Sequence, residues 1–537
     1  MDGPNVNWKF YSMLTDEAKR EHNSHMLNIG SCGLHILHGA FKDGAVASGW
    51  QLDRLFSSLH WLFQDSPARR EDYTKVTGNS LFALKFCKHR WLENVLVAER
   101  TQSMWDSVVK YVQSARAGKV PQPQNKSFET VQEFVADPFT TAKVAFFLSV
   151  AKQVTPFLTL YQTDKPMLPF LATDLYSMLG GLMRRFIKTT VISEAKTPLK
   201  LTKLDPADSS IHASHSKIDL GFTADKKIKE SIAKSTVSEK RVLQFQMECK
   251  EFLMKVVCKL IAKAPIQYSL VRNINCLDPR NMMSDHDVSI TKFKRVLTTL
   301  ENAKKVPEGE CDSLLELFRQ FIMEVPSSSP SEFKDYDPNN DRLDSFLYLH
   351  MGQKRSYQSL WKVVSELLIL SHGQASVERG FSVNKQLEVE NLQERSFIAQ
   401  RLVQDHVQSV GGVLAVSINK PLLLSAAGAR QKYLSYLDEQ KRKKTSEGVE
   451  LKRKELVDEL DELKKKRRRL DSDVDNLVKS ADEFAQKAED TGKLVWITKS
   501  NSLRRTAKEK EIARKDLECK IANVVDELKK AYTFSST

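Results

Sequence analysis

The sequence predicts a mainly α-helical protein that ends in a coiled-coil tail. Most apolar residues recur three and four positions apart, which is the period of an amphipathic helix. The last hundred or so residues repeat apolar side chains every seven positions, which is the spacing of a coiled coil. Only one short segment, residues 27–31, has the pattern of a β-strand.

Length and charge restrict the class of protein. The chain has 537 residues, 41% of them hydrophobic and 28% charged, which is typical of a globular protein with charge-rich extensions. Such a length allows more than one core. Lysine and arginine number 82 against 68 aspartates and glutamates, so the net charge is +14. This excess favours a polyanionic partner through a sequence-independent field.

The cysteine pattern and the hydropathy of the chain indicate in which cellular compartment the protein is expected. The seven cysteines are scattered and odd in number, so they do not predict a disulfide framework. The N-terminus "MDGPNVNWKF" has no basic region followed by an apolar core, unlike a secretory signal. The most apolar window, from Val144, is interrupted by Lys152 and Pro156. We therefore expect a soluble intracellular protein without a membrane partner.

The elements follow in order along the chain. "LNIGSCGLHILHGAF" (27–41) has the pattern of one strand that runs into a helix. Helical periodicity continues over residues 90–118, 141–161, 171–190 and 243–263. Polar stretches at 119–127 and about 191–240 are expected to be connectors. Residues 324–342 are expected to form a loop before a helix that begins near Leu343.

The tail has a seven-residue repeat. One position of the repeat holds Val449, Leu456, Leu463, Leu470, Leu477 and Phe484, and its companion four residues later holds Leu460, Val474 and Ala481. Arg467 interrupts the companion position, and Gly492 is expected to end the helix. A second helix follows with Leu517, Ile521, Val524 and Leu528 in phase. This pattern permits an antiparallel hairpin or an intermolecular zipper.

The stretch "LSHGQASVERGFSVNK" (370–385) places an acid beside a base. The capping-box spacing of Ser371 and Gln374 predicts a helix that begins at Ser371. Neither Glu378 nor Arg379 has an oppositely charged residue three or four positions away, so their partners must come from elsewhere. A buried face marked by Val377 and Phe381 would put Glu378 at its rim. A rim carboxylate is either an ion-pair member, the interpretation we favour, or an acid that holds a divalent cation.

Several motifs together resemble a known family. "ASVERGFS" (375–382), preceded by "YQSLWKVVSELLILS" (357–371), resembles the C-terminal dimerisation segment of hAT-superfamily transposases. "CGLHILHGAF" (32–41) is similar to the Cys-x-x-His element of that family, and Arg90–Trp91 to its Arg-Trp pair. "LYQTDKPMLPFL" (160–171) resembles part of its helical insertion domain. The motifs occur in the family's order, and the resemblance covers about residues 2 to 415.

The resemblance implies a fold and a catalytic triad. These transposases have an RNase H-like fold in which Asp, Asp and Glu bind two divalent metals, Mg²⁺ or Mn²⁺. Glu378 would match the glutamate of this triad, and Asp2 would match the second aspartate. The two residues would bind metal only if the RNase H-like core were complete. The first aspartate belongs upstream of Asp2, where only Met1 stands. We therefore expect an incomplete RNase H-like fragment, no enzyme activity and no cofactor, unless the sequence is a truncated form of an active transposase.

The family resemblance and the seven-residue repeat of the tail together predict four regions along the chain. Expected regions are a remnant of the RNase H-like core at 1–60, a helical insertion at 61–340, a dimerisation region at 341–415 and the coiled-coil tail at 430–533. The resemblance to the dimerisation segment implies a homodimer. Its interface is expected to include Leu367, Leu370, Val377 and Phe381.

Two further groups of residues are candidates for binding. Arg90, Trp91 and Arg379 are candidate nucleic-acid contacts, although Trp91 fits a core position equally well. A metal site is also conceivable from the Cys and His residues near the two family motifs, but a packed junction is the interpretation we favour. These residues are Cys32, His35, His38, Cys87 and His89.

A basic run in the tail suggests a location in the cell. It consists of Lys464, Lys465, Lys466, Arg467, Arg468 and Arg469. Such a run is typical of a nuclear-import or phosphate-binding patch, and the alternative is a solvated face of the coiled coil. The sequence thus favours an inactive nuclear protein that dimerises and binds DNA mainly through charge. The alternative is a scaffold whose coiled coil recruits a protein partner without nucleic acid.

Overall fold

The computed structural model describes residues 5–233, 237–389, 392 and 394–533. These residues are mainly α-helical and contain no β-strand, which confirms the predicted class. Among the described residues, Ile187 and His212 form one isolated antiparallel β-bridge. The chain divides into two compact units, Met1–Asn391 and Leu392–Thr537, and each is described by itself.

The first unit consists of many helices of different lengths. Its first half contains α1 (Asn5–His22), α2 (Gly33–Ala47), α3 (Leu52–Phe63), α4 (Pro67–Thr77), η1 (Trp91–Asn94), α5 (Val95–Arg116), α6 (Lys126–Ala136), α7 (Thr140–Tyr161), α8 (Leu168–Arg184), α9 (Thr189–Glu194), α10 (Pro198–Leu201), η2 (Ser209–Ile211), η3 (His215–Lys217) and α11 (Phe222–Ala233). Its second half contains α12 (Glu239–Lys263), η4 (Pro265–Gln267), α13 (Ser269–Asn273), η5 (Ile274–Leu277), α14 (Pro279–Ser284), α15 (His286–Asn302), α16 (Glu308–Ser328), α17 (Pro330–Lys334), α18 (Leu343–Leu347), η6 (Tyr348–Gly352), η7 (Arg355–Tyr357), α19 (Gln358–Leu368) and α20 (Ala375–Leu387).

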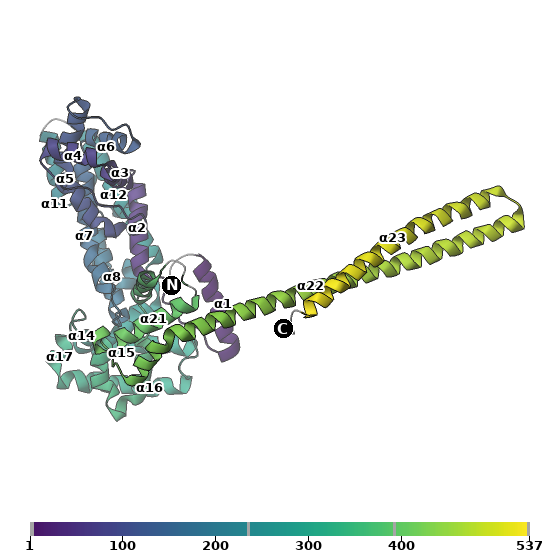
Figure 1. The fold of residues 1–537 in the computed structure, drawn as a ribbon. Coiled ribbons are helices and arrows are strands. Elements are labelled where there is room, and N and C mark those ends of the chain that lie inside the picture. The colour runs from purple at the N-terminus through teal and green to yellow at the C-terminus, as the bar shows by residue number, and fades with distance from the viewer. Residues whose placement is uncertain (1–4, 234–236, 390–391, 393, 534–537) are drawn as a thin grey trace. The chain divides into compact units, whose positions relative to one another are not determined.

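Close packing of α2 against α12 fixes the helix that carries His35 and His38 (Figure 1). Gly44 allows this approach, because a Cβ atom at this position would lie 2.7 Å from Val256 Cγ2 and 2.9 Å from the Phe252 carbonyl oxygen. The ring of Phe41 meets Phe252 edge-on at 5.8 Å between centroids. α2 is therefore held firmly along its length, and its N-terminal turn has a defined place in the first unit.

α7 is a central element of this core. It is long and apolar enough to cross a membrane by length and composition, with a mean hydropathy of 1.3 over its most apolar window. Within the structure, 61% of that window is buried. Burial on this scale is typical of a core helix, and the exposed residues of α7 are confined to Lys152, Gln153, Pro156 and Thr159.

The second unit consists of α21 (Glu394–Ser409), η8 (Val413–Ala415), α22 (Lys420–Thr491) and α23 (Leu494–Thr533). α22 and α23 pack antiparallel as a hairpin within the chain (Figure 1). Ser500 Oγ donates to the Ala481 carbonyl at 2.8 Å, and the rings of Phe484 and Trp496 stack at 5.4 Å. Gly492 ends α22 in the left-handed conformation at φ +66°, as predicted from the sequence. Of the two arrangements that the heptads permit, the structure has the hairpin.

The strand predicted over residues 27–31 is wrong. Residues 24–30 are irregular, and Gly30 adopts φ +89°, which no regular strand contains. A single extended segment also has no neighbouring strand with which to pair its backbone groups in the described chain. The first sixty residues therefore contain helices in place of the expected sheet remnant, as far as they are described.

The predicted connectors differ from the structure in two places. Residues 117–125 do separate α5 from α6. The segment 191–240 is not a simple linker, because Ile192 and Leu201 anchor α9 and α10 in the core and Leu220 buries the stretch before α11. The expected loop at 324–342 is partly helical: α16 continues through Pro326 to Ser328, and α17 begins with Pro330 at its first position, which a helix tolerates. The helix expected near Leu343 is present as α18.

The boundary between the two units falls after residue 391. It therefore lies inside the predicted dimerisation region at 341–415. The part of that region before the boundary includes α18, α19 and α20, whereas α21 and η8 belong to the second unit.

Candidate functional site

The site is built on the first turn of α20, which begins later than the sequence predicts. The hydroxyl of Ser371 donates to the carbonyl of Gly373, so it does not cap a helix. Gln374 precedes the first helical residue, Ala375. Glu378 consequently lies in the first turn of α20, where the helix dipole stabilises a negative charge.

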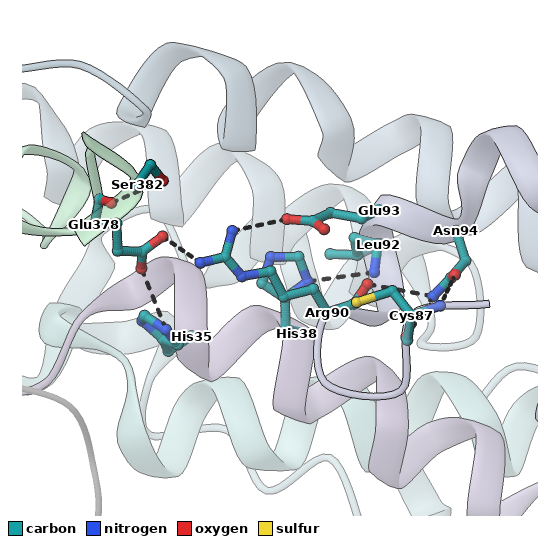
Figure 2. A network of polar contacts seen from close by, with 9 residues as sticks. All are labelled: His35, His38, Cys87, Arg90, Leu92, Glu93, Asn94, Glu378 and Ser382. Carbon is teal, nitrogen blue, oxygen red and sulfur yellow. Dashed lines mark hydrogen bonds and ion pairs between the residues drawn. The ribbon is translucent and has the colours of Figure 1, made fainter. Parts of the chain in front are cut away.

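Glu378 binds two cationic or polar partners from distant parts of the first unit (Figure 2). Its Oε2 accepts from Arg90 Nη2 at 2.5 Å, and its Oε1 lies 3.3 Å from Nε2 of His35. The Glu378 side chain is one-third exposed, so this ion pair is partly shielded from solvent. The expectation that its partners come from outside its own helix is confirmed.

Arg90 joins two carboxylates. Its Nη1 donates to Glu93 Oε1 at 2.9 Å, while its Nη2 bonds to Glu378 (Figure 2). The hydrogen bond to Glu93, followed by the attraction of Glu378, raises the pKa of Arg90 above its ordinary value. Because this guanidinium stays charged at any physiological pH, both carboxylates have a permanent counter-charge.

Buried Asn94 holds the loop that presents Arg90. Its Oδ1 accepts from the backbone N–H of Cys87 at 2.7 Å, and its amide donates to the Cys87 carbonyl at 2.9 Å. The same amide donates to the carbonyl of Trp91 at 3.1 Å. Asn94 therefore fixes the turn between Cys87 and η1 from inside.

His38 is a buried neighbour of this network. Its Nδ1 accepts a hydrogen bond from the backbone N–H of Leu92 at 3.3 Å. Burial lowers the pKa of His38 to about 4, and the nearby Arg90 charge acts in the same direction. The imidazole is therefore neutral at pH 7, and it orients η1 against α2.

Cys32 extends the network to the start of α2. Burial opposes ionisation of its thiol, but hydrogen bonds from His35 and from the backbone of Gln374 outweigh burial and lower its pKa. Cys32 and His35 are the two named residues of the Cys-x-x-His element. One residue of this element thus contacts the α20 loop, and the other contacts Glu378 itself.

A cavity of about 350 Å³ lies over these groups. Its polar lining includes His35, His38, Arg90, Glu93 and Glu378. Arg379 also lines it and lies 3.8 Å from Asp164 Oδ2, with its side chain more than half exposed. The cavity thus offers charged groups of both signs, most of them already engaged with each other.

The described residues do not fit the two-metal centre that the family resemblance implies. Such a centre needs several carboxylates that converge on each ion. Both oxygens of Glu378 face Arg90 or His35, and a guanidinium at 2.5 Å repels a divalent cation. Asp2 lies outside the described residues. Within the described ranges, no group of three or more His, Cys, Asp or Glu side chains is placed to hold a metal.

The cysteines and histidines considered as metal ligands also form no metal site among the described residues. Cys32, His35 and His38, with Cys87 or His89, form no metal-binding group in the part of the chain that the structure describes. Their observed contacts are hydrogen bonds and an ion pair at the junction between α2, η1 and α20. The packed-junction interpretation therefore describes the observed arrangement.

Trp91 lies in the core and not in the cavity of Glu378. It is only 4% exposed. Its ring meets Phe86 edge-on at 5.3 Å and Phe147 at 6.3 Å between centroids. This burial favours the core interpretation of Trp91 over a contact with nucleic acid.

The predicted dimerisation residues are divided between core and surface. Leu367 is buried and Leu370 is half-buried in the first unit. Val377 and Phe381 were expected on the buried face of α20, but they are 54% and 65% exposed. Their apolar spacing marks one face of the helix, and more than half of each of these two residues is exposed.

The basic run at 464–469 lies within α22. Successive helical residues point about 100° apart, so six consecutive side chains cover every side of the helix. Arg467 turns toward the hairpin seam, with its Nε 3.6 Å from Asp471 Oδ2. The other five are exposed on the remaining sides. A partner on one side would therefore contact only part of the run.

Sequence reasoning did not identify Glu93 and Asn94 as members of the site. A local signal existed for Glu93, since it lies three residues after Arg90 and so on the same side of a helical turn. Asn94 carried no such signal, because its role depends on the course of the preceding loop.

Comparison of this chain with protein-family models, with curated proteins and with solved structures found no match.

Proposed function

We propose that this chain is a transposase-derived, catalytically inactive nuclear protein that forms homodimers and binds DNA mainly through charge. One observation carries this proposal. His35, Arg90 and Glu378 belong to three separate motifs that resemble elements of hAT transposases, and their side chains lie in contact. Motifs far apart in sequence that meet at one cavity support a common ancestral site.

The ion pair supports the loss of catalysis. In a two-metal nuclease the glutamate must offer its oxygens to a cation. Here the strongest contact of Glu378 is to Arg90, which also binds Glu93. Breaking this arrangement to admit a metal would leave a guanidinium beside a divalent ion, which is electrostatically unfavourable.

Charge supports binding to DNA. The chain carries a net charge of +14, and five side chains of the basic run are exposed. Arg379 adds an exposed cation beside the cavity. Contacts of this kind neutralise phosphates without reading bases, so affinity should fall steeply with salt and depend little on sequence.

A mobility-shift titration over a salt series tests the DNA proposal. Each phosphate contact contributes about 0.9 to the slope of log affinity against log salt for duplex DNA. Replacing Lys464, Lys465 and Lys466 with glutamine should lower that slope by up to about 3. A control that replaces the exposed lysines Lys196, Lys200 and Lys203 changes the net charge equally and should leave the slope nearly unchanged.

Two outcomes contradict the electrostatic mechanism. One is an affinity that ignores ionic strength, and the other is no binding at all in dilute salt. An equal loss for both triple variants would show that total charge, and not the basic run, determines affinity.

We propose that the basic run at 464–469 has a second role, in nuclear import, besides its role in DNA binding. A fluorescent fusion of the full chain should accumulate in the nucleus. Replacement of residues 464–469 with glutamine should disperse it. The same change at six exposed lysines of the first unit serves as the control for lost charge: Lys196, Lys200, Lys203, Lys226, Lys229 and Lys240. Unchanged accumulation in the first variant would remove import from the functions of this run.

The hairpin favours a second candidate, a protein-interaction scaffold. Its tip exposes most of Leu494 and Val495 and nearly half of Ile497. Apolar side chains at the end of a long helical pair are a typical docking feature. Removal of residues 430–537 discriminates the two candidates, because loss of protein partners with unchanged DNA affinity would support the scaffold.

A further inference from the structure

Three side chains at the junction of α2 and α20 form a series of contacts that ends in a thiol. Nε2 of His35 lies 3.3 Å from Glu378 Oε1 (Figure 2), and the His35 side chain also contacts the thiol of Cys32. Because Nε2 is directed at the carboxylate, Nδ1 is the nitrogen that remains for the thiol. A nucleophile beside a base that a third group orients is the geometry of an activated nucleophile. We refer to Cys32, His35 and Glu378 as the thiol triad.

The position of Cys32 favours its ionised form. Cys32 is the N-cap residue of α2, where the partial positive charge of the helix N-terminus stabilises an anion. The backbone N–H of Gln374 donates to its sulfur from the loop before α20. Burial opposes ionisation, but these contacts and the His35 side chain outweigh it and lower the pKa of the thiol. The thiolate is the form of cysteine that acts as a nucleophile.

The shift at Cys32 is opposite to that of four other cysteines. Burial raises the pKa of Cys249 and of Cys276, which are fully buried in the core. Burial, followed by the charge of nearby carboxylates, also raises the pKa of Cys258 and of Cys311. Cys32 is more than nine-tenths buried as well, so burial alone does not explain its behaviour. The contacts of the thiol triad distinguish Cys32 from these four residues.

A cavity of about 260 Å³ lies beside Cys32, and Ser371, His372 and Gly373 contribute to its lining. The sulfur is closely confined, because a Cβ atom at Gly373 would lie 3.6 Å from Cys32 Sγ. Nε2 of His372 donates to the Tyr161 carbonyl at 3.0 Å, so this histidine is engaged elsewhere. The thiol of a second protein is too large for this space, whereas hydrogen peroxide has only two oxygen atoms and fits it. The confinement therefore favours a small oxidant as the reactant.

We propose that Cys32 is a site of oxidation by hydrogen peroxide, with His35 as its base and Glu378 as the residue that positions His35. His35 takes the thiol proton, and the thiolate attacks one oxygen of the peroxide. The S–O bond forms as the O–O bond breaks, so sulfur loses two electrons and the peroxide gains them. His35 returns the proton to the departing hydroxide, and the products are a sulfenic acid and water. This inference does not depend on DNA binding or on dimerisation.

Peroxide treatment of the full chain, followed by capture of sulfenic acids, tests the site. Dimedone added together with guanidinium labels sulfenic acids after unfolding, so burial does not hide them. Mass spectrometry of the peptides then reports each cysteine separately. In the wild type at pH 7, Cys32 should be oxidised at least about 100-fold faster than Cys249 or Cys276. Equal rates for these three cysteines would overturn the proposal.

The pH profile of the same reaction tests whether Cys32 reacts as a stabilised thiolate. A free thiol with a pKa of about 8.5 reacts about 75-fold more slowly at pH 6 than at pH 8, because less of it is ionised. Since the pKa of Cys32 is lowered, its rate should fall less than about half as much over this range. A wild-type profile as steep as that of free cysteine would contradict activation by the thiol triad.

Two variants separate the base from the residue that positions it. His35→Gln should slow oxidation of Cys32 at pH 7 at least about 10-fold and steepen its pH profile, whereas Glu378→Gln should slow it about 3-fold. His89→Gln replaces an exposed histidine of the same unit and should change neither quantity. A wild-type rate in His35→Gln would overturn the role of His35. Oxidation of Cys276 in a variant would report an opened core, and the wild-type pH profile would then decide alone.

Discussion

The two units bury their side chains in different ways. In the first unit, α7 is buried on nearly every side, and rings from several helices meet around Phe147. In the second unit, α22 has 72 residues, yet its buried residues are confined to the seam with α23, among them Leu456 and Ala481. In a central core each side chain packs against many neighbours. In a two-helix seam each side chain contacts only a few residues of the facing helix, so each contributes less to stability. Substitutions should therefore cost more in the first unit.

The largest effect is expected from Phe147→Ala. The side chain is fully buried and contacts the rings of Phe41, Phe56 and Trp91. Loss of such a ring should lower the free energy of unfolding of the first unit by about 3–5 kcal/mol. Leu463→Ala, in the half-buried seam, should cost about 1–2 kcal/mol. Urea titrations measure both, and equal losses would remove the contrast between the units.

A pH effect of intermediate size should be confined to the first unit. The pKa of His38 is about 4 in the folded chain and about 6.5 in an unfolded one. Between these values the unfolded chain binds the proton more tightly, so stability rises with pH. The contribution is complete above pH 6.5 and is lost as the pH falls toward 4. It amounts to about 3 kcal/mol.

His38→Asn isolates this contribution. An asparagine oxygen can still accept from the Leu92 N–H, but it does not titrate. Urea titrations between pH 4 and 7 should show a flatter dependence in the variant. Some slope should remain, because burial also lowers the pKa of His372. Identical slopes would mean that His38 is not held neutral by the fold.

A smaller effect is expected at the end of the hairpin. Gly492 adopts φ +66° with open space around it, so Gly492→Ala should lose about 1 kcal/mol through backbone strain alone. Gly448→Ala is the matched control, because Gly448 is helical and equally open. It should stabilise the hairpin by about 0.5–1 kcal/mol. Thermal unfolding of the hairpin reports both, and effects of the same sign would contradict the assigned end of α22.

The smallest effect is expected for Arg379→Ala. The ion pair with Asp164 measures 3.8 Å, and both side chains are more than half exposed. Its loss should change the free energy of unfolding by less than about 0.5 kcal/mol. A loss above about 2 kcal/mol in a urea titration would indicate a buried partner that the structure does not contain.

The sequence predicted the helical class and the apolar seam of the tail because periodicity is a local property, but it left open whether α23 or another chain covers that seam. Gly492 marked the end of α22 for the same reason. Periodicity identified the apolar side of α20, but it did not reveal whether another segment covers Val377 and Phe381. The helix start at Ser371 was mistaken because its hydroxyl binds the backbone of Gly373 instead.

The candidate site was predictable only in part. The absence of in-helix partners for Glu378 correctly indicated a distant one, and the motif resemblance supplied both His35 and Arg90. Their mutual contact depends on the path of three separate segments, which no local spacing determines. Asn94 remained hidden, since its hydrogen bonds join backbone groups that come together only after folding.

The central claim is that Glu378 belongs to an ion pair and does not hold a metal. A Mn²⁺ titration followed by electron paramagnetic resonance tests this claim most directly, because free Mn²⁺ gives a signal that bound Mn²⁺ loses. Wild-type protein and Glu378→Gln should reduce the signal to the same extent at every concentration. A loss of signal in the wild type that Glu378→Gln abolishes would contradict the account.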